Sequence, residues 1–329
     1  MFSAGLKVVT NTLDSRYLVN IFLPSLIFWS LLLFVAVSTH PEVSDALNAW
    51  INQTLEAKIL QSVSFFSGVL FFSGLASARL NSILRMYEGY WNFLLSRYLK
   101  RLGERWHQSR LCKLYEKSQL DIAAYEEIYL RYPMPSHIRE EVMPTSPGNI
   151  LKNSELYPND RYNIDAVLIW PRLYNLFPQR FAQTIADARS GLDFMLMVSS
   201  LNGAFALISG GYLLVVSADW WLFPVCFGGG LLVAWLAYRS ALGAAVLYAQ
   251  LIKAAFDLYR NQLLTHMRLR LPHTWIEERA TWGQVNQFLY RGIPIDSKAL
   301  ISNATVPPPT EGGTVAFQRI VTNIDSRYL

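Results

Sequence analysis

The chain has little charge and almost no cysteine. Asp, Glu, Lys and Arg make up 16% of its 329 residues, against roughly 25% in soluble domains. The two cysteines, Cys112 and Cys226, lie far apart, one in a basic stretch and the other in an apolar one. The sequence therefore predicts neither a disulfide nor a cysteine metal site, and its low charge weighs against an ordinary soluble domain.

The sequence also lacks the common motifs of nucleotide-binding, metal-dependent and serine enzymes. It contains no GxGxxG, no Gly-Lys-Ser/Thr phosphate loop and no GxSxG elbow, which carry phosphate binding and nucleophilic catalysis. Its five histidines show no i, i+4 pairing and no HExxH-like grouping. We therefore expect no metal, no cofactor and no catalytic residues, and we expect that the protein is not an enzyme.

What the sequence does contain is long apolar stretches, with 52% hydrophobic and 14% aromatic residues. Four stretches are long enough for the roughly 20 helical residues that cross a bilayer core. They cover residues 21–38, 59–77 and 192–216, and a fourth that begins at residue 222 and passes residue 238. The sequence predicts an all-α membrane protein with four transmembrane helices.

The distribution of Lys and Arg predicts the orientation of these helices. Residues 39–57 carry three acidic residues and no Lys or Arg, whereas residues 78–191 carry 16 basic residues. Positive residues favour the cytoplasmic side of a membrane. We expect the two short connections outside, both termini in the cytoplasm, and an inner (cell) membrane location.

The helical pattern continues beyond the apolar stretches. Apolar residues keep the i, i+3, i+4, i+7 rhythm from Leu80 to Leu102 and from the fourth span to Pro272, so we expect long helical cytoplasmic extensions. Thr274 and Glu277 form a capping-box pattern for a last helix that ends near Gly292. These features predict five parts: 1–77 with the first hairpin, 78–191 as a cytoplasmic helical domain, 192–249 as the second hairpin, 250–305 as C-terminal helices, and 306–329 as a flexible linker and tail.

The segment 144–178 is dense in polar and charged residues among apolar ones. Its candidate network consists of Asn149, Glu155, Arg161, Asp165 and Arg172. Because the charges alternate in sign, they could form an ion-pair network that ties the cytoplasmic part to the base of the third span. A ligand or catalytic site is the alternative, and it requires that these groups converge in a pocket.

The same segment resembles an uncharacterised bacterial family of multi-pass membrane proteins. The resemblance covers about a tenth of the chain and rests on Gly148, Asn149, Glu155, Tyr157, Pro158, Arg161, Tyr162, Asp165, Ala166, Trp170, Pro171, Arg172 and Leu173. The chain departs from the pattern at Asn153 and Ser154, where alanines are expected. The family has no assigned activity, so the resemblance implies no function.

Few polar residues interrupt the predicted spans. Gln61, Ser199, Ser200 and Asn202 could hydrogen-bond between helices or line a pore. Asp193 and Arg239 are expected at the inner membrane edge as a pair, with Arg189 as the competing partner of Asp193. The small residues Ala206 and Gly210 on the third span and Gly230 on the fourth predict close helix contact.

Basic and aromatic residues are interleaved between Arg79 and Lys117, with nine basic and three acidic residues. This pattern can indicate nucleic-acid binding. Directly after a membrane span it more simply indicates attraction to anionic lipid headgroups. We expect lipid as the partner rather than nucleic acid.

Two membrane hairpins, a long cytoplasmic segment between them and both ends inside make this topology similar to that of bestrophin anion channels. Asn81, Ser82, Arg85, Glu88 and Trp91 echo those proteins, but the chain lacks the Asp-Pro-Phe-Gly stretch expected after the fourth span. The hypothesis that follows is a homo-oligomeric channel or pore-like effector regulated by its cytoplasmic helices. The alternative is a non-conducting membrane anchor or scaffold whose cytoplasmic domain binds a protein partner.

Overall fold

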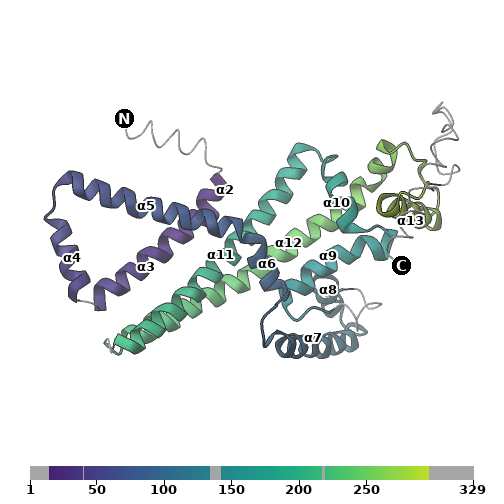
Figure 1. Cartoon of the computed structure of the whole chain (residues 1–329). Helices are drawn as coiled ribbons and strands as arrows, with labels where there is room; N and C mark the ends of the chain where they lie inside the picture. Colours follow the sequence, from purple (N-terminus) through teal and green to yellow (C-terminus); the bar gives the residue numbers. More distant parts are fainter. Residues whose placement is uncertain (1–14, 40, 134–141, 217–218, 296–329) are drawn as a thin grey trace, which may run out of the picture. The chain divides into compact units, whose positions relative to one another are not determined.

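The computed structural model describes residues 15–39, 41–133, 142–216 and 219–295. Every element of secondary structure assigned within these ranges is a helix (Figure 1). In chain order the helices are α2 (Ser15–Tyr17), η1 (Leu18–Phe22), α3 (Leu23–Thr39), α4 (Pro41–Ile51), α5 (Leu55–Ala78), α6 (Leu80–Glu88), α7 (Ser96–Ser118), α8 (Ile122–Arg131), α9 (Ser146–Tyr162), α10 (Ala166–Tyr174), α11 (Gln179–Val216), η3 (Pro224–Gly228), α12 (Gly229–His266) and α13 (Trp275–Arg291). The chain divides into two compact units, Met1–Leu263 and Leu264–Leu329, which we describe separately. The predicted tail at 306–329 lies outside the described residues.

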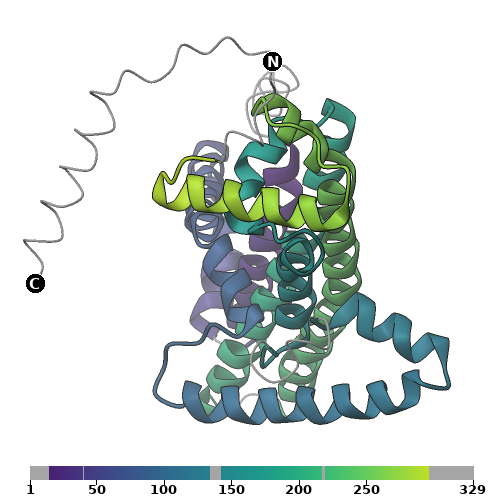
Figure 2. The ribbon, with the colours of Figure 1, turned by 90° about the vertical axis from the view of Figure 1, so that its right-hand side faces the viewer.

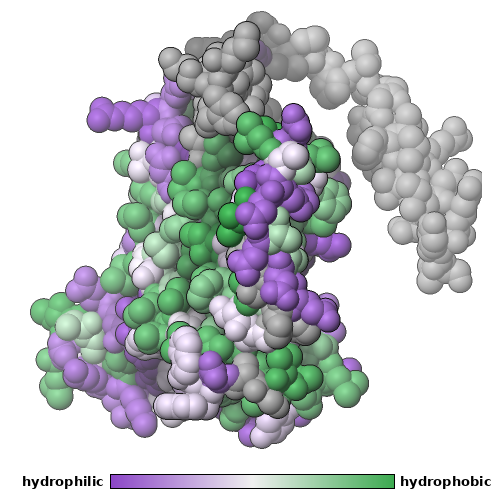
Figure 3. Space-filling model, turned by 90° about the vertical axis from the view of Figure 1, so that its left-hand side faces the viewer, coloured by the Kyte–Doolittle hydropathy of each residue, from purple (hydrophilic) through white to green (hydrophobic). Residues whose placement is uncertain are grey.

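Four helices are long and apolar enough to cross a membrane, as predicted. They are Leu18–Thr39, Leu55–Ala78, Gln179–Val216 and Pro224–His266. Seen from one side, the surface carries large hydrophobic areas, with hydrophilic residues gathered in separate patches (Figure 3). The 38 residues of α11 correspond to about 57 Å of helix, well beyond a hydrocarbon core of roughly 30 Å. The third and fourth helices therefore continue past the length that a membrane needs.

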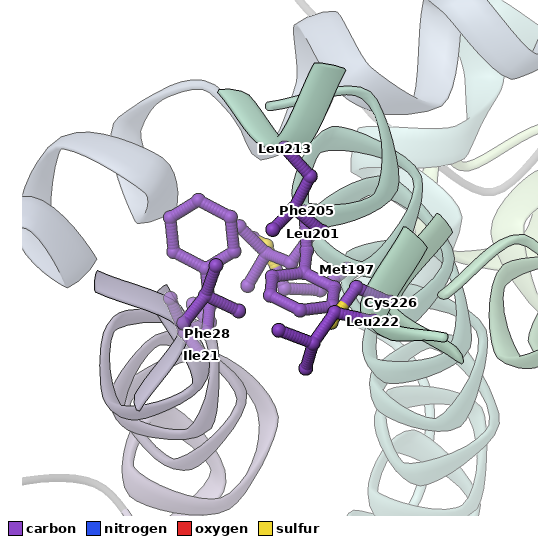
Figure 4. Packing of buried hydrophobic residues seen from close by; sticks show 9 residues of the cluster. Ile21, Phe28, Met197, Leu201, Phe205, Leu213, Leu222 and Cys226 are labelled. Carbon is purple, nitrogen blue, oxygen red and sulfur yellow. The ribbon is translucent and has the colours of Figure 1, made fainter. Parts of the chain in front are cut away.

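The first and third spans run side by side in the same direction. Arg16 pairs with Asp187 at 2.7 Å at one end, and the hydroxyls of Thr39 and Tyr212 lie 2.9 Å apart at the other. Between these contacts lies a cluster of buried apolar side chains from the first span, α11 and the start of the fourth span (Figure 4), made of Ile21, Phe28, Val35, Met197, Leu201, Phe205, Leu213, Leu222 and Cys226. This cluster holds the two hairpins together.

Close contact between α11 and α12 depends on small residues, as the sequence predicted. A Cβ built on Gly230 would lie 2.9 Å from Cβ of Ala206, and one built on Gly210 would lie 2.7 Å from the ring of Phe227. Neither space admits a side chain without movement. Further along α12, its alanines let α6 and α9 pack against α11 and α12. The buried residues of this second cluster are Leu84, Ile150, Leu192, Leu196, Ala241, Leu242, Ala245 and Ala249.

The prediction that one helix continues from Leu80 to Leu102 is wrong. The structure ends α6 at Glu88, and Gly89 follows in the left-handed region with φ of 98°. A Cβ at Gly89 would meet Pro144 at 2.3 Å. The apolar rhythm continues on both sides of this glycine and so concealed the break, although glycine after the last helical turn is a common stop signal.

After the break, α7 and α8 form a helical hairpin of their own (Figure 2). Leu111 and Ile128 are buried between them, and Arg110 pairs with Glu127 at 2.8 Å. Asp121 caps α8 by accepting a hydrogen bond from the backbone N–H of Ala123. The predicted cytoplasmic extension after the second span is thus a short helix followed by a hairpin rather than one straight stalk.

The second unit contains α13, which matches the predicted last helix. The Oγ1 of Thr274 accepts from the backbone N–H of Glu277, and Gly292 ends the helix with φ of 68°. The carboxylate of Glu277 accepts from the backbone N–H of His273, so both partners of the capping box are engaged. Trp282 and Val285 are fully buried.

Candidate functional site

The polar residues of α11 are used in contacts inside the subunit. Oγ of Ser199 accepts from the hydroxyl of Tyr87 at 2.9 Å and donates to the carbonyl of Ala234 at 2.9 Å, which joins α6, α11 and α12. Ser200 and Asn202 donate to carbonyls one turn earlier in α11. Asn202 also lines a small apolar cavity of about 90 Å³ between α3 and α11. The hydrogen bonds of Ser199 therefore join helices, whereas those of Ser200 and Asn202 to these carbonyls stay within α11.

The fourth pore candidate, Gln61, lies on the least covered span. In the most apolar stretch of α5 only 11% of the residues are buried, against 28%, 39% and 33% in the corresponding stretches of the first, third and fourth spans. Gln61, Ser64, Ser67, Gly68 and Gly74 are all exposed. We call this surface, which also carries Leu60, Phe71 and Leu75, the open face of α5. The opposite side of the helix is covered, since Ser73 lies 2.6 Å from the hydroxyl of Tyr17.

The segment 144–178 forms α9 and α10, and its motif residues have structural tasks. Asn149 is almost fully buried; its Oδ1 accepts from the backbone N–H of Met143, and its Nδ2 donates to the carbonyls of Met143 and Thr145. A Cβ on Gly148 would lie 2.2 Å from the carbonyl oxygen of Glu88. Asn149 therefore holds the turn before α9, and Gly148 lets the start of α9 lie against the end of α6.

Each of the four charged candidates of this segment has at least one contact with a residue close to it in the chain. Glu155 pairs with Lys152 at 3.2 Å, and Asp165 caps α10 by accepting from the backbone N–H of Leu168. Arg172 donates to the carbonyl of Leu168. The guanidinium of Arg161 lies 5.4 Å from the ring centre of Tyr157. Both interpretations of these four residues, the ion-pair network and the ligand or catalytic site, stay predictions.

The sequence analysis missed a group of polar contacts that joins α9 to α12. The hydroxyls of Tyr157 and Tyr162 both donate to the carboxylate of Asp257, at 3.0 and 2.7 Å. One turn earlier, Lys253 is 2% exposed and donates to the carbonyl of Tyr129 at 3.0 Å. Burial and the neighbouring carboxylate raise the pKa of Tyr157 well above its usual value. The sequence signal for these contacts was the pair of opposite charges at Lys253 and Asp257, four residues apart in an otherwise apolar stretch.

Asp193 pairs with the competing partner rather than with Arg239. Nε of Arg189 lies 3.0 Å from Oδ1 and 3.1 Å from Oδ2 of Asp193. The guanidinium also lies 5.7 Å from the ring centre of Tyr248. Arg239 is exposed, and its guanidinium lies 5.8 Å from the ring centre of Trp235 in the previous turn of the same helix. The two side chains of the pair, four residues apart on one helix face, meet more easily than side chains on different helices.

Arg189 stands between two cavities. The first cavity has a volume of about 440 Å³ and is lined by Asn20, Ser190 and Asp193, among others. The second has a volume of about 390 Å³ and lies between α6, α9, α10, α11 and α12. Its lining includes Glu88, Glu155 and Phe256. Burial raises the pKa of the Glu88 carboxyl, while Arg189 and Arg85 act in the opposite direction. This region, which we call the Arg189 junction, connects α6 directly to the spans.

Within the part of the chain that the structure describes, no group of three or more His, Cys, Asp or Glu residues could hold a metal ion. Comparisons with protein-family models, with curated proteins and with solved structures found no match. The functional interpretation therefore depends on the geometry of α5 and of the Arg189 junction.

Proposed function

We propose that the protein is an oligomeric membrane channel in which the open face of α5 from each copy surrounds a central path. The observation that carries this proposal is the contrast between the spans: α5 has the smallest buried share, and its open face collects Gln61, Ser64, Ser67, Gly68 and Gly74. Small and weakly polar residues on a span let helices approach one another and let water or ions pass. A closed ring of identical subunits would bring the open face of α5 from every copy towards one central axis.

The helices outside the spans regulate this path in the proposal. The chain passes from α5 to α6 at Arg79, and α6 carries Leu84 and Glu88 into the cavity of the Arg189 junction. A ligand or partner that changed this cavity would act directly on the end of α5. The excess of basic residues between the hairpins would favour anions near the cytoplasmic mouth.

Chloride efflux from liposomes that contain the purified protein tests the proposal. Gly68→Leu would place a large side chain on the open face and should reduce efflux to near background while leaving the oligomer intact. Asn202→Leu is the matched control, because Asn202 lies between α3 and α11; its efflux should stay close to that of the unchanged protein. Oligomer size is measured in parallel by light scattering.

The non-conducting anchor remains the second candidate, because the open face of α5 also carries the large apolar residues Leu60, Phe71 and Leu75, which suit contact with lipid. A monomer, or an oligomer with no efflux for chloride or small cations, would support the anchor and reject the channel.

A further inference from the structure

The first half of α7 and the turn that precedes it expose a row of large apolar side chains. Leu94, Tyr98, Leu102 and Trp106 recur every four residues and are 99%, 68%, 56% and 55% exposed, and Leu95 beside them is 64% exposed. Residues at this spacing share one face of a helix. We call these five residues the α7 stripe. Within the described part of the chain, nothing covers it.

The other side of α7 is fully engaged. A Cβ on Gly103 would lie 2.4 Å from the carbonyl oxygen of Pro144, and His107 and Leu111 are buried towards α8. Nδ1 of His107 lies 3.0 Å from the hydroxyl of Tyr132. Because α7 is held on this side, its stripe must face outward in the folded subunit.

Positive charge accompanies the stripe. Arg97, Lys100, Arg101 and Arg105 lie within the same turns, with Glu104 as the single acidic residue between them. An interface between two protein copies is usually depleted of charge at its core, and it would gather eight like charges here if two stripes met. Apolar and aromatic residues flanked by Lys and Arg are instead typical of a helix that lies in a membrane surface.

The structure holds α7 near one end of the apolar part of α12. Pro144 contacts both Gly89 and Gly103, and the ring of Tyr87, two residues before Gly89, stacks on that of Tyr238 with the ring centres 6.0 Å apart. From Leu222 to Tyr238 the helix rises about 24 Å, which approaches the roughly 30 Å of a bilayer core. In Figures 1 and 2, α7 runs across the line of α12 rather than along it.

We propose that α7 lies in the membrane surface beside the spans, with the α7 stripe among the lipid chains and Arg97, Lys100, Arg101 and Arg105 against anionic phospholipid headgroups. Basic residues close to an anionic surface are attracted to it, and this attraction falls off within a Debye length. The helix therefore acts as a lipid-sensing contact directly connected, through Gly89, to α6. This inference does not depend on whether the protein conducts ions.

Lipid quenching of a dye on single cysteines tests the proposal in the full-length protein. Cys112→Ser and Cys226→Ala remove the native thiols, and Leu94→Cys or Leu102→Cys then carries the dye on the stripe. Tyr115→Cys is the matched control, since Tyr115 is exposed on another side of the same helix. In nanodiscs of brominated phosphatidylcholine with phosphatidylglycerol, we expect quenching on the stripe to be roughly twofold or more above that at position 115.

A charge variant gives the second measurement. Lys100→Gln with Arg101→Gln and Arg105→Gln should lower the quenching at position 102, whereas Lys113→Gln with Lys117→Gln on the last turns should leave it unchanged. Leu94 is almost fully exposed, so its substitution does not disturb packing. Equal quenching at positions 94, 102 and 115 would overturn the proposal. Disulfide cross-links between copies through position 102 would also overturn it and would assign the stripe to a subunit interface.

Discussion

The hydroxyl of Tyr87 donates a hydrogen bond to Oγ of Ser199, 2.9 Å away, and this contact joins α6 to the third span. A hydrogen bond between neutral groups contributes about 1 kcal/mol to stability. We expect Tyr87→Phe to lower the stability of the detergent-solubilised protein by about that amount, and to cost much less in a Ser199→Ala background because the partner is already gone. Thermal unfolding of the two single variants and the double variant measures this coupling. Tyr98→Phe, at an exposed position, serves as the control.

The turn after α6 requires glycine. Gly89 has φ of 98° and leaves no room for a Cβ beside Pro144. Gly89→Ala should therefore destabilise the protein by more than about 1 kcal/mol. Gly243→Ala is the control, because no atom lies within 4 Å of its Cβ position in α12; this change should be neutral or stabilise by up to about 1 kcal/mol. Equal midpoints of thermal unfolding for both variants would contradict this explanation of the break.

Stability should fall in acid because of His107. Burial, and to a lesser extent Arg110, lowers the pKa of this imidazole from 6.5 to about 4. The folded state therefore favours the neutral ring: its contribution is complete above pH 6.5 and is lost as the pH falls from 6.5 towards 4. The loss amounts to at most about 3 kcal/mol.

His107→Gln removes this titration. The difference in unfolding free energy between this variant and the unchanged protein should therefore change between pH 6.5 and pH 4. His273→Gln, at an exposed position, should follow the unchanged protein. A pH profile that is identical for His107→Gln and the unchanged protein would show that His107 makes no such contribution.

Loss of one partner of the Arg189–Asp193 pair should be costly because both side chains are largely covered, at 28% and 18% exposure. Arg189→Gln leaves the Asp193 carboxylate without its partner and should cost about 3 kcal/mol. Arg189→Gln with Asp193→Asn should recover part of this loss. Arg239→Gln should change stability by less than about 0.5 kcal/mol. If Arg239→Gln proved as damaging as Arg189→Gln, the pairing seen here would not describe the protein in a membrane.

The predicted orientation can be checked by cysteine labelling in intact cells. In a chain without its native thiols, Asp45→Cys and Asp219→Cys should react with a membrane-impermeant reagent. Leu120→Cys, at a position 96% exposed in the structure, should react only after permeabilisation. Reaction at position 120 in intact cells would reverse the arrangement inferred from the Lys and Arg distribution.

The helical class, the four apolar spans and the last helix were predictable because each depends on neighbours in sequence. A span needs only a sufficient run of apolar residues, and the start of α13 needs only Thr274 and Glu277 three residues apart. The close contact of α11 with α12 was also readable, since Gly230 and Ala206 are small whatever surrounds them.

Other features depend on residues far apart in the chain, and only the tertiary structure decided them. The chain turns at Gly89, where the apolar rhythm suggested a continuous helix, and Pro144 packs against this turn. Asp193 has two arginines within plausible reach, and the helix geometry selects Arg189. The motif of segment 144–178 contains Tyr157 and Tyr162 but not the partner of their hydroxyls, because Asp257 comes from a helix about 95 residues further on. Periodicity records which residues prefer burial; it does not record which surface buries them.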